Sequence, residues 1–246
     1  FKGVNRCESS VADGCCPSAD EMIRDVRLFK RNNINCLRMS HYPNHRLMYD
    51  LCDEYGIYVC AEANVESHGI GYGTDCLPER AEWQPPIVER NVRNAQTYRN
   101  HASVFMWSVG NESGWGKGLA MAREAVRKID PMRPFHGLGW KVTADYKGED
   151  HSASDVISSQ YVSFEHLKEL AALGKPVWIS EYSCAMGNGM GNLKEYWDVF
   201  YSSDKLSGGC IWDWIDQAYW RDDGRGGRFL AYGGDADEEP NDGPFC

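Results

Sequence analysis

Short apolar runs alternate with amphipathic stretches along the whole chain. Eight runs have the length and composition of buried strands, at residues 1–6, 35–39, 57–61, 104–109, 135–140, 156–160, 177–180 and 209–214. Apolar residues recur at helical spacing between most of these runs. One helix starts at the capping-box pair Ser18 and Glu21, and the others are predicted at 45–55, 86–98, 118–129, 164–173 and 193–201.

Eight strands, with a helix after most of them, predict a parallel sheet with helical crossovers. For 246 residues the expected α/β fold is the closed (β/α)8 TIM barrel. A doubly wound open sheet is the alternative. It calls for a glycine-rich turn after the first strand, whereas residues 7–10 read CESS, and the chain has no Walker loop.

Residues 1–246 are expected to form a single domain. The chain starts at Phe1, already inside a predicted strand, and shows no signal-peptide pattern. We therefore expect it to be a catalytic barrel excised from a longer polypeptide.

Composition and charge narrow the choice of partners. Hydrophobic residues make up 42% of the chain and charged residues 25%, as in a folded globular protein. No apolar run approaches the roughly 18 residues that a membrane helix needs, so no membrane partner is expected. The net charge is −10 and the 26 basic residues are spread out, which argues against nucleic acid. A neutral ligand such as a sugar remains open.

The ten cysteines do not have the spacing of a disulfide or zinc framework. Cys36, Cys52, Cys60 and Cys210 lie inside apolar runs, where a thiol packs as a small hydrophobic group. The sequence contains no CxxC pair. A reducing, intracellular setting is therefore expected.

Polar residues gather directly after the predicted strands. They are Ser40, His41, Asn64, Glu66, His68, Asn111, Glu112, Tyr161, Glu181, Asp213 and Asp216. In a barrel these positions share the C-terminal rim, where active sites lie. Acids after strands also cap helices, and that alternative stays open for each residue alone. It does not account for the concentration of bulky polar groups on one rim.

Glu112 and Glu181 form the most informative pair. The fourth and seventh strands stand across the barrel mouth, so both side chains can point inward. Two facing carboxyl groups are what glycoside cleavage requires, one protonated to assist the leaving oxygen and one ionised to attack the anomeric carbon. Nearby tryptophans suit the apolar faces of a sugar ring, although tryptophans also serve as core residues.

Glu66, His68 and Glu112 form a second constellation. The Glu-x-His spacing puts both side chains on one side of an extended segment. Two carboxylates and one imidazole would suit a hard divalent cation completed by water. Spacing alone is a weak basis for this metal site.

The chain resembles the catalytic barrel of glycoside hydrolase family 2, and within it the large bacterial β-galactosidases. The matching segments are KGVNR (2–6), RMSHYPN (38–44), EANVESHG (62–69), WSVGNES (107–113), EYSCAMGN (181–188), GGCIWDWIDQ (208–217), YGGD (232–235) and ND (241–242). They occur in the family's order and cover essentially the whole chain. The SHYPN, EANVESHG and EYSCAMGN forms favour galactosidases over the family's glucuronidases and mannosidases.

The resemblance assigns roles to the rim residues. Glu112 matches the family's acid/base and Glu181 its nucleophile. His41 matches a histidine that stabilises the transition state. The positions that match sugar-pocket residues are Asn111, Tyr161 and Trp212.

The resemblance also implies metal ions. Glu66, His68 and Glu112 match the ligands of an active-site Mg²⁺. Asn241 matches a peripheral magnesium ligand, and Phe245 matches a residue whose carbonyl helps to hold Na⁺.

Two positions depart from the family pattern. Cys7 and Cys184 stand where family members have histidines that touch the bound sugar. A thiol is a poor hydrogen-bond donor without positive charge, and strands one and seven are near neighbours, so both thiols are expected to face the pocket. Family members also carry flanking β-sandwich domains. The resemblance implies these as partners in the parent polypeptide, together with a homo-oligomeric, cytoplasmic, bacterial setting.

The sequence therefore predicts a retaining β-glycoside hydrolase that acts on terminal β-D-galactosides through two glutamates. One alternative is a family member for another β-sugar, such as a glucuronide, a fucoside or an arabinoside. The other is a catalytically silent barrel that only binds carbohydrate.

Overall fold

The structure is a computed structural model, which describes residues 1–137, 140–142, 147–149, 154–185, 189–235 and 239. Its centre is an eight-stranded sheet in which every ladder is parallel, with the strand order β5-β4-β3-β2-β1-β10-β9-β8. These strands are β1 (Lys2–Asn5), β2 (Cys36–Arg38), β3 (Tyr58–Glu62), β4 (Val104–Ser108), β5 (Phe135–His136), β8 (Ile157–Gln160), β9 (Val177–Tyr182) and β10 (Leu206–Ile211).

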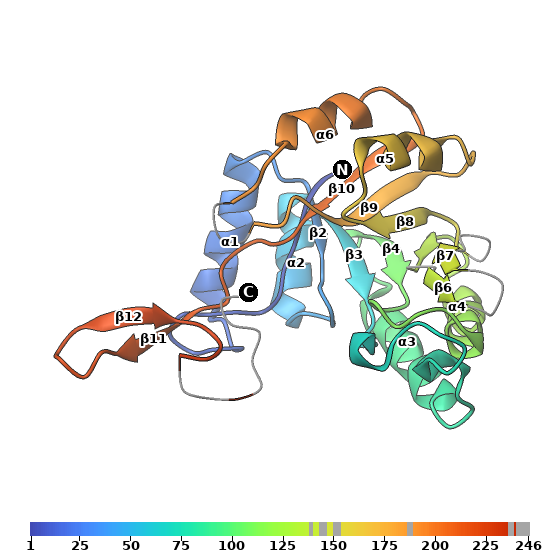
Figure 1. The fold of residues 1–246 in the computed structure, drawn as a ribbon. Coiled ribbons are helices and arrows are strands. Elements are labelled where there is room, and N and C mark those ends of the chain that lie inside the picture. Colours follow the sequence, from blue (N-terminus) through green and yellow to red (C-terminus); the bar gives the residue numbers. More distant parts are fainter. Residues whose placement is uncertain (138–139, 143–146, 150–153, 186–188, 236–238, 240–246) are drawn as a thin grey trace.

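The sheet curls into a nearly closed barrel with its helices on the outside (Figure 1). A backbone hydrogen bond 3.0 Å long runs from N of Asp155, just before β8, to O of Phe135 in β5, and so brings the two ends of the sheet order together. The predicted (β/α)8 TIM-barrel fold is therefore confirmed. The covering helices are α1 (Ala19–Arg31), α2 (Arg46–Tyr55), α3 (Gln84–Tyr98), α4 (Lys117–Ile129), α5 (Phe164–Ala171) and α6 (Leu193–Phe200).

Local sequence signals set the ends of several helices. Ser18 caps α1, and its hydroxyl accepts from the Glu21 backbone N–H while the Glu21 carboxylate accepts from the Ser18 backbone N–H. This is the capping box predicted from the sequence, and it satisfies two donors that the first turn leaves unpaired. Gly56 ends α2 in the left-handed region, at φ 67°, which costs glycine little.

Residues 135–140 do not form one strand, contrary to the sequence prediction. β5 ends at His136, and Trp140 begins the separate strand β6 (Trp140–Val142), which pairs antiparallel with β7 (Lys147–Glu149). Apolar character alone does not distinguish a barrel strand from a hairpin strand next to it. This hairpin lies between β5 and β8, in a stretch for which the sequence predicted no helix.

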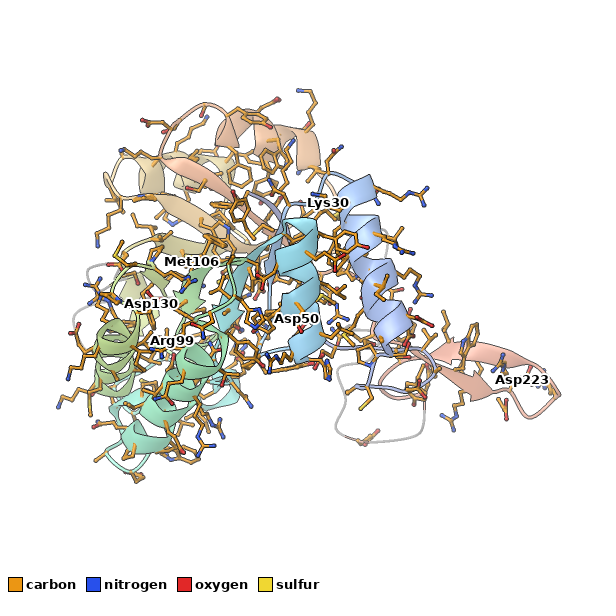
Figure 2. The ribbon with its side chains drawn as sticks, turned by 180° about the vertical axis from the view of Figure 1, so that it is seen from behind. Lys30, Asp50, Arg99, Met106, Asp130 and Asp223 are labelled. Carbon is orange, nitrogen blue, oxygen red and sulfur yellow. The ribbon has the colours of Figure 1, made fainter. Side chains whose placement is uncertain are left out.

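A second hairpin follows the last barrel strand. β11 (Tyr219–Asp222) and β12 (Arg228–Ala231) pair antiparallel and extend away from the barrel, with Asp223 near the tip (Figures 1 and 2). Figure 2 also shows α1 and α2 side by side on the barrel's outer face, marked by Lys30 and Asp50. Two short 3₁₀ turns, η1 (His68–Ile70) and η2 (Leu77–Glu79), lie in the long loop after β3.

Apolar side chains pack both outside and inside the barrel. Two clusters fill the space between sheet and helices, and a third gathers Cys36, Cys60, Met106, Trp178 and Cys210 from five barrel strands. The buried thiols behave as small hydrophobic groups, as predicted. Among the described residues, no helix is long and apolar enough to cross a membrane.

Candidate active site

The carboxyl ends of the barrel strands surround one cavity of about 690 Å³. Its wall contains ten described residues that lie at or after the ends of seven different strands. They are Cys7, His41, Glu66, His68, Asn111, Glu112, Tyr161, Glu181, Trp212 and Gln217. Because parallel strands end on the same rim, side chains far apart in sequence meet here. Nine of the ten were candidate site residues in the sequence, and Gln217 is the addition.

Glu181 lies almost fully buried at the end of β9. Its Oε1 accepts from Arg38 Nη1 at 2.7 Å, and its Oε2 accepts from the Tyr161 hydroxyl at 2.9 Å. Burial and the neighbouring Glu181 charge raise the pKa of the Tyr161 hydroxyl, so Tyr161 remains a donor. Two donors therefore hold the Glu181 carboxylate in one orientation.

Glu112 has a different environment. Burial raises the pKa of its carboxyl, and the negative charge of Glu181 raises it further. Its Oε2 lies 2.5 Å from His68 Nδ1 and accepts from the Tyr72 hydroxyl at 3.4 Å. The cavity therefore contains one carboxyl group whose pKa is raised and one that two hydrogen bonds hold.

Backbone geometry places Glu112 at the cavity wall. A side chain at Gly110 would bring its Cβ within 2.4 Å of the Val65 carbonyl oxygen, so only glycine allows this approach. The close contact lets Asn111 N donate to Val65 O at 2.8 Å, which joins the loops after β3 and β4. Glu112 itself has a φ of 33°, a strained left-handed value of the kind that concentrates at functional sites.

Asn111 connects the separate parts of the cavity. Its Nδ2 donates to Glu66 Oε2 at 2.7 Å. Its Oδ1 accepts from Arg38 Nη2 at 2.8 Å and from Gln160 Nε2 at 3.0 Å. Both ends of the amide are thus committed, which fixes the Asn111 side chain beside Glu112.

Arg38 and Glu62 are central to the site but were not among the residues proposed from the sequence. Arg38 is fully buried below the cavity and binds Glu62, Glu181 and Asn111. Glu62 ends β3 and is also fully buried. Charged residues at the ends of apolar strands are a usable signal, because a charge in such a place must be paired. Their pairing partners could not be read from spacing.

Glu66, His68 and Glu112 lie together, as the metal hypothesis requires. Their candidate ligand atoms are all within 4.8 Å of one another. Two carboxylates and an imidazole form a donor set that suits a divalent cation completed by water. His68 is largely exposed and stacks on Tyr72, with the ring centroids 5.4 Å apart.

The two cysteines that depart from the family pattern have different positions. Cys7 is in the cavity wall, with its sulfur 3.7 Å from Ser40 Oγ, and burial raises the pKa of its thiol to about 11. The described wall does not include Cys184, which is half-buried on the turn after β9. Cys184 nevertheless lies close enough to the wall residue Tyr161 for its charge to affect the pKa of that hydroxyl, so the prediction that both thiols face the pocket stays a prediction for Cys184.

Asp213 acts on this part of the wall through Gln217 and Cys7. Burial raises the pKa of its carboxyl to about 6, and Gln217 Nε2 donates to it at 3.0 Å. The predicted ion ligands Asn241 and Phe245 lie outside the described residues.

A known protein family matches the chain over its full length. The description "Glycosyl hydrolases family 2, TIM barrel domain" matches residues 1–246, the entire chain. The chain belongs to glycosyl hydrolase family 2. Residues 1–246 are the TIM-barrel domain of this family, as the motifs in the sequence indicated.

Solved structures share the fold of this family 2 domain at low sequence identity. A β-glucuronidase from Faecalibacterium prausnitzii has a TM-score of 0.68 at 23% identity, over 87% of this chain and 42% of that chain. A β-galacturonidase from Eisenbergiella tayi has a TM-score of 0.68 at 23% identity, over 86% and 43%. A β-glucuronidase from Dictyoglomus thermophilum has a TM-score of 0.67 at 24% identity, over 87% and 43%. The chain thus spans about two fifths of the length of these proteins.

Proposed function

We propose that this family 2 domain is a retaining β-glycosidase for terminal β-D-galactosides, with Glu181 as nucleophile and Glu112 as acid/base. The observation that carries the proposal is the contrast between the two glutamates in one cavity. Arg38 and Tyr161 donate to Glu181, whereas burial and the charge of Glu181 raise the pKa of Glu112. Opposed environments of this kind divide the acid and nucleophile roles between two carboxyl groups.

In the first step, the Glu181 carboxylate attacks the anomeric carbon and the bond to the leaving oxygen breaks. Glu112 transfers its proton to that oxygen, and a covalent glycosyl-enzyme remains. Arg38 and Tyr161 keep the attacking carboxylate aligned. The Trp212 ring forms an apolar wall for the sugar.

In the second step, Glu112 acts as a base. It removes a proton from a water molecule, whose oxygen attacks the anomeric carbon and releases Glu181. Two displacements on the same carbon return the original configuration. The product released first is then the β-anomer.

Glu66, His68 and Glu112 would hold a magnesium ion. Their donor set and their mutual spacing fit such an ion. When bound, it would supply a fixed positive charge beside the acid/base and tune its acidity. In this arrangement His68 and Glu66 position Glu112 relative to the sugar, and Asn111 holds Glu66 in place.

Removal of magnesium is expected to lower both turnover and thermal stability. The three side chains would then hold two like charges close together without a counter-ion. We expect chelation to reduce kcat and the melting temperature, and added Mg²⁺ to restore both. The matched control is the His68→Ala variant, whose melting temperature should respond less to added Mg²⁺. Turnover and melting that stay unchanged after the metal is shown to be gone would refute the assignment.

The cavity favours a neutral sugar over a uronic acid. None of the ten wall residues that the structure describes is Lys or Arg, and three of them are glutamates. Arg38 lies below the wall, where Glu62 and Glu181 already bind its guanidinium. A glucuronide carboxylate would therefore meet negative charge without a cation among the described wall residues. The galactoside-type sequence motifs support the same choice.

A β-glucuronide is the second candidate, because the similar solved structures include β-glucuronidases and a β-galacturonidase. Fucosides and arabinosides remain neutral alternatives, and a silent carbohydrate-binding barrel is the non-enzymatic one. Cys7, in place of the family's histidine, is the wall residue that bears most directly on this choice.

Nitrophenyl glycosides distinguish these candidates. We expect the full polypeptide to hydrolyse the β-galactoside with at least about tenfold higher kcat/KM than the β-glucuronide, a difference of about 1.4 kcal/mol. The β-fucoside and α-arabinoside complete the panel. A higher kcat/KM for the glucuronide would overturn the sugar assignment, and no turnover of any member would support the silent barrel.

A further inference from the structure

Glu62 occupies an unusual position for a carboxylate, because it is fully buried yet touches the floor of the active site. Its Oε2 accepts from Arg38 Nε at 2.8 Å and from the Ser108 hydroxyl at 2.8 Å. Its Oε1 lies 2.8 Å from Nδ1 of His41. Glu62 is absent from the cavity wall, so it can act on a substrate only through another residue.

The charge state of Glu62 determines which hydrogen bond it makes with His41. Burial alone would raise its pKa, but the Arg38 charge and the bond with His41 lower the pKa to about 2. Glu62 is therefore ionised at any working pH, and an ionised carboxylate only accepts hydrogen bonds. The proton between the two residues must belong to His41 Nδ1.

The other ring nitrogen of His41 faces the reacting groups. Nε2 lies 3.8 Å from Glu181 Oε1 and 3.5 Å from Asn111 Nδ2. The ring also stacks on Trp212 at a centroid distance of 5.1 Å and an interplanar angle of 9°. Trp212 thus fixes the plane of the His41 ring. The bond between Glu62 and Nδ1 fixes its rotation within that plane, so that Nε2 points into the cavity.

We infer that Glu62 is a positioning residue that fixes the tautomer and orientation of His41, so that Nδ1 carries the proton and Nε2 is presented to the sugar. The inference rests on the proposed function, since it takes the cavity to be the sugar site. In the neutral ring, Nε2 is then an acceptor for a sugar hydroxyl. A second-layer carboxylate sets the role of a histidine in this way in other enzymes.

Glu62→Gln inverts this arrangement with little change in shape. Arg38 and Ser108 both donate toward Oε2, so the amide oxygen of glutamine takes that place and its NH₂ group faces His41. An NH₂ group donates, so Nδ1 must become the acceptor and the proton moves to Nε2. In the full polypeptide we expect kcat/KM on the best nitrophenyl glycoside to fall at least about 100-fold.

A double-mutant cycle separates positioning from a general structural role. In a protein that already carries His41→Phe, Glu62→Gln should lower kcat/KM by less than about a further threefold, because the residue through which Glu62 acts is gone. The matched control is Ser108→Ala, which removes a donor to the same carboxylate but leaves the bond to His41. Ser108→Ala should lower kcat/KM by less than about tenfold. Additive losses in the cycle, or equal losses in Ser108→Ala and Glu62→Gln, would overturn the inference.

The tautomer can also be observed without turnover. In protein labelled with ¹⁵N-histidine, the ¹⁵N chemical shift of each ring nitrogen of His41 shows whether that nitrogen is protonated. We expect a protonated Nδ1 in the wild type and a protonated Nε2 in Glu62→Gln, with His41→Phe providing the assignment. The same tautomer in both proteins would refute the inference. A wild type without glycosidase activity that still shows the tautomer change would refute the proposed function instead.

Discussion

Glu181→Gln is expected to lower kcat by at least about 10⁴-fold, because the amide cannot form the glycosyl-enzyme. The substitution keeps the shape of the side chain, and its carbonyl oxygen can still accept from Arg38 or Tyr161. Substrate binding should therefore survive better than turnover. Steady-state kinetics with the nitrophenyl galactoside, together with binding of a galactose-type inhibitor, measure the two effects separately.

Azide rescue gives this prediction its control. In Glu181→Gly the missing carboxylate leaves room for a small anion to attack the anomeric carbon directly. We expect azide to restore turnover and to yield the α-glycosyl azide, since a single displacement inverts the configuration. A Glu181→Gln enzyme that keeps a tenth of its activity would show that another group is the nucleophile. An azide product of retained configuration would do the same.

The loss of kcat/KM in Glu112→Gln is expected to depend on the leaving group of the substrate. For an alkyl galactoside, whose oxygen must be protonated, kcat/KM should fall by about 10²- to 10⁴-fold. For a dinitrophenyl galactoside, which leaves without a proton, kcat/KM should change little. The second step still needs a base, so the glycosyl-enzyme should accumulate. Its formation should be visible as a rapid initial burst of dinitrophenol.

The pH profile checks the same residue. Burial and the Glu181 charge raise the pKa of Glu112, so the wild-type acid keeps its proton to a higher pH than a free glutamate does. Activity should then fall on the alkaline side as Glu112 loses that proton. Glutamine does not titrate, so this alkaline limb should disappear in the variant. An unchanged limb, or equal losses for both leaving groups, would contradict the assignment.

Most of the barrel and most of the cavity wall could be predicted from sequence, because both depend on local or periodic signals. The capping box of Ser18 and Glu21 marks the start of α1 within a few residues. Parallel strands all end on one rim, so polar residues after strands converge whatever the details of packing. This explains why Glu112 and Glu181 share a cavity, although 69 positions separate them.

The tertiary structure alone decided which charges pair. Arg38 meets Glu181 across 143 positions and Glu62 across 24, and neither spacing has a local signature. The end of β5 at His136 likewise depends on packing around the barrel. Periodicity determined where the strands run and which rim carries the chemistry. A buried charge is stable only beside a counter-charge. Which buried charges pair therefore depends on distances between strands that are set only when the barrel closes.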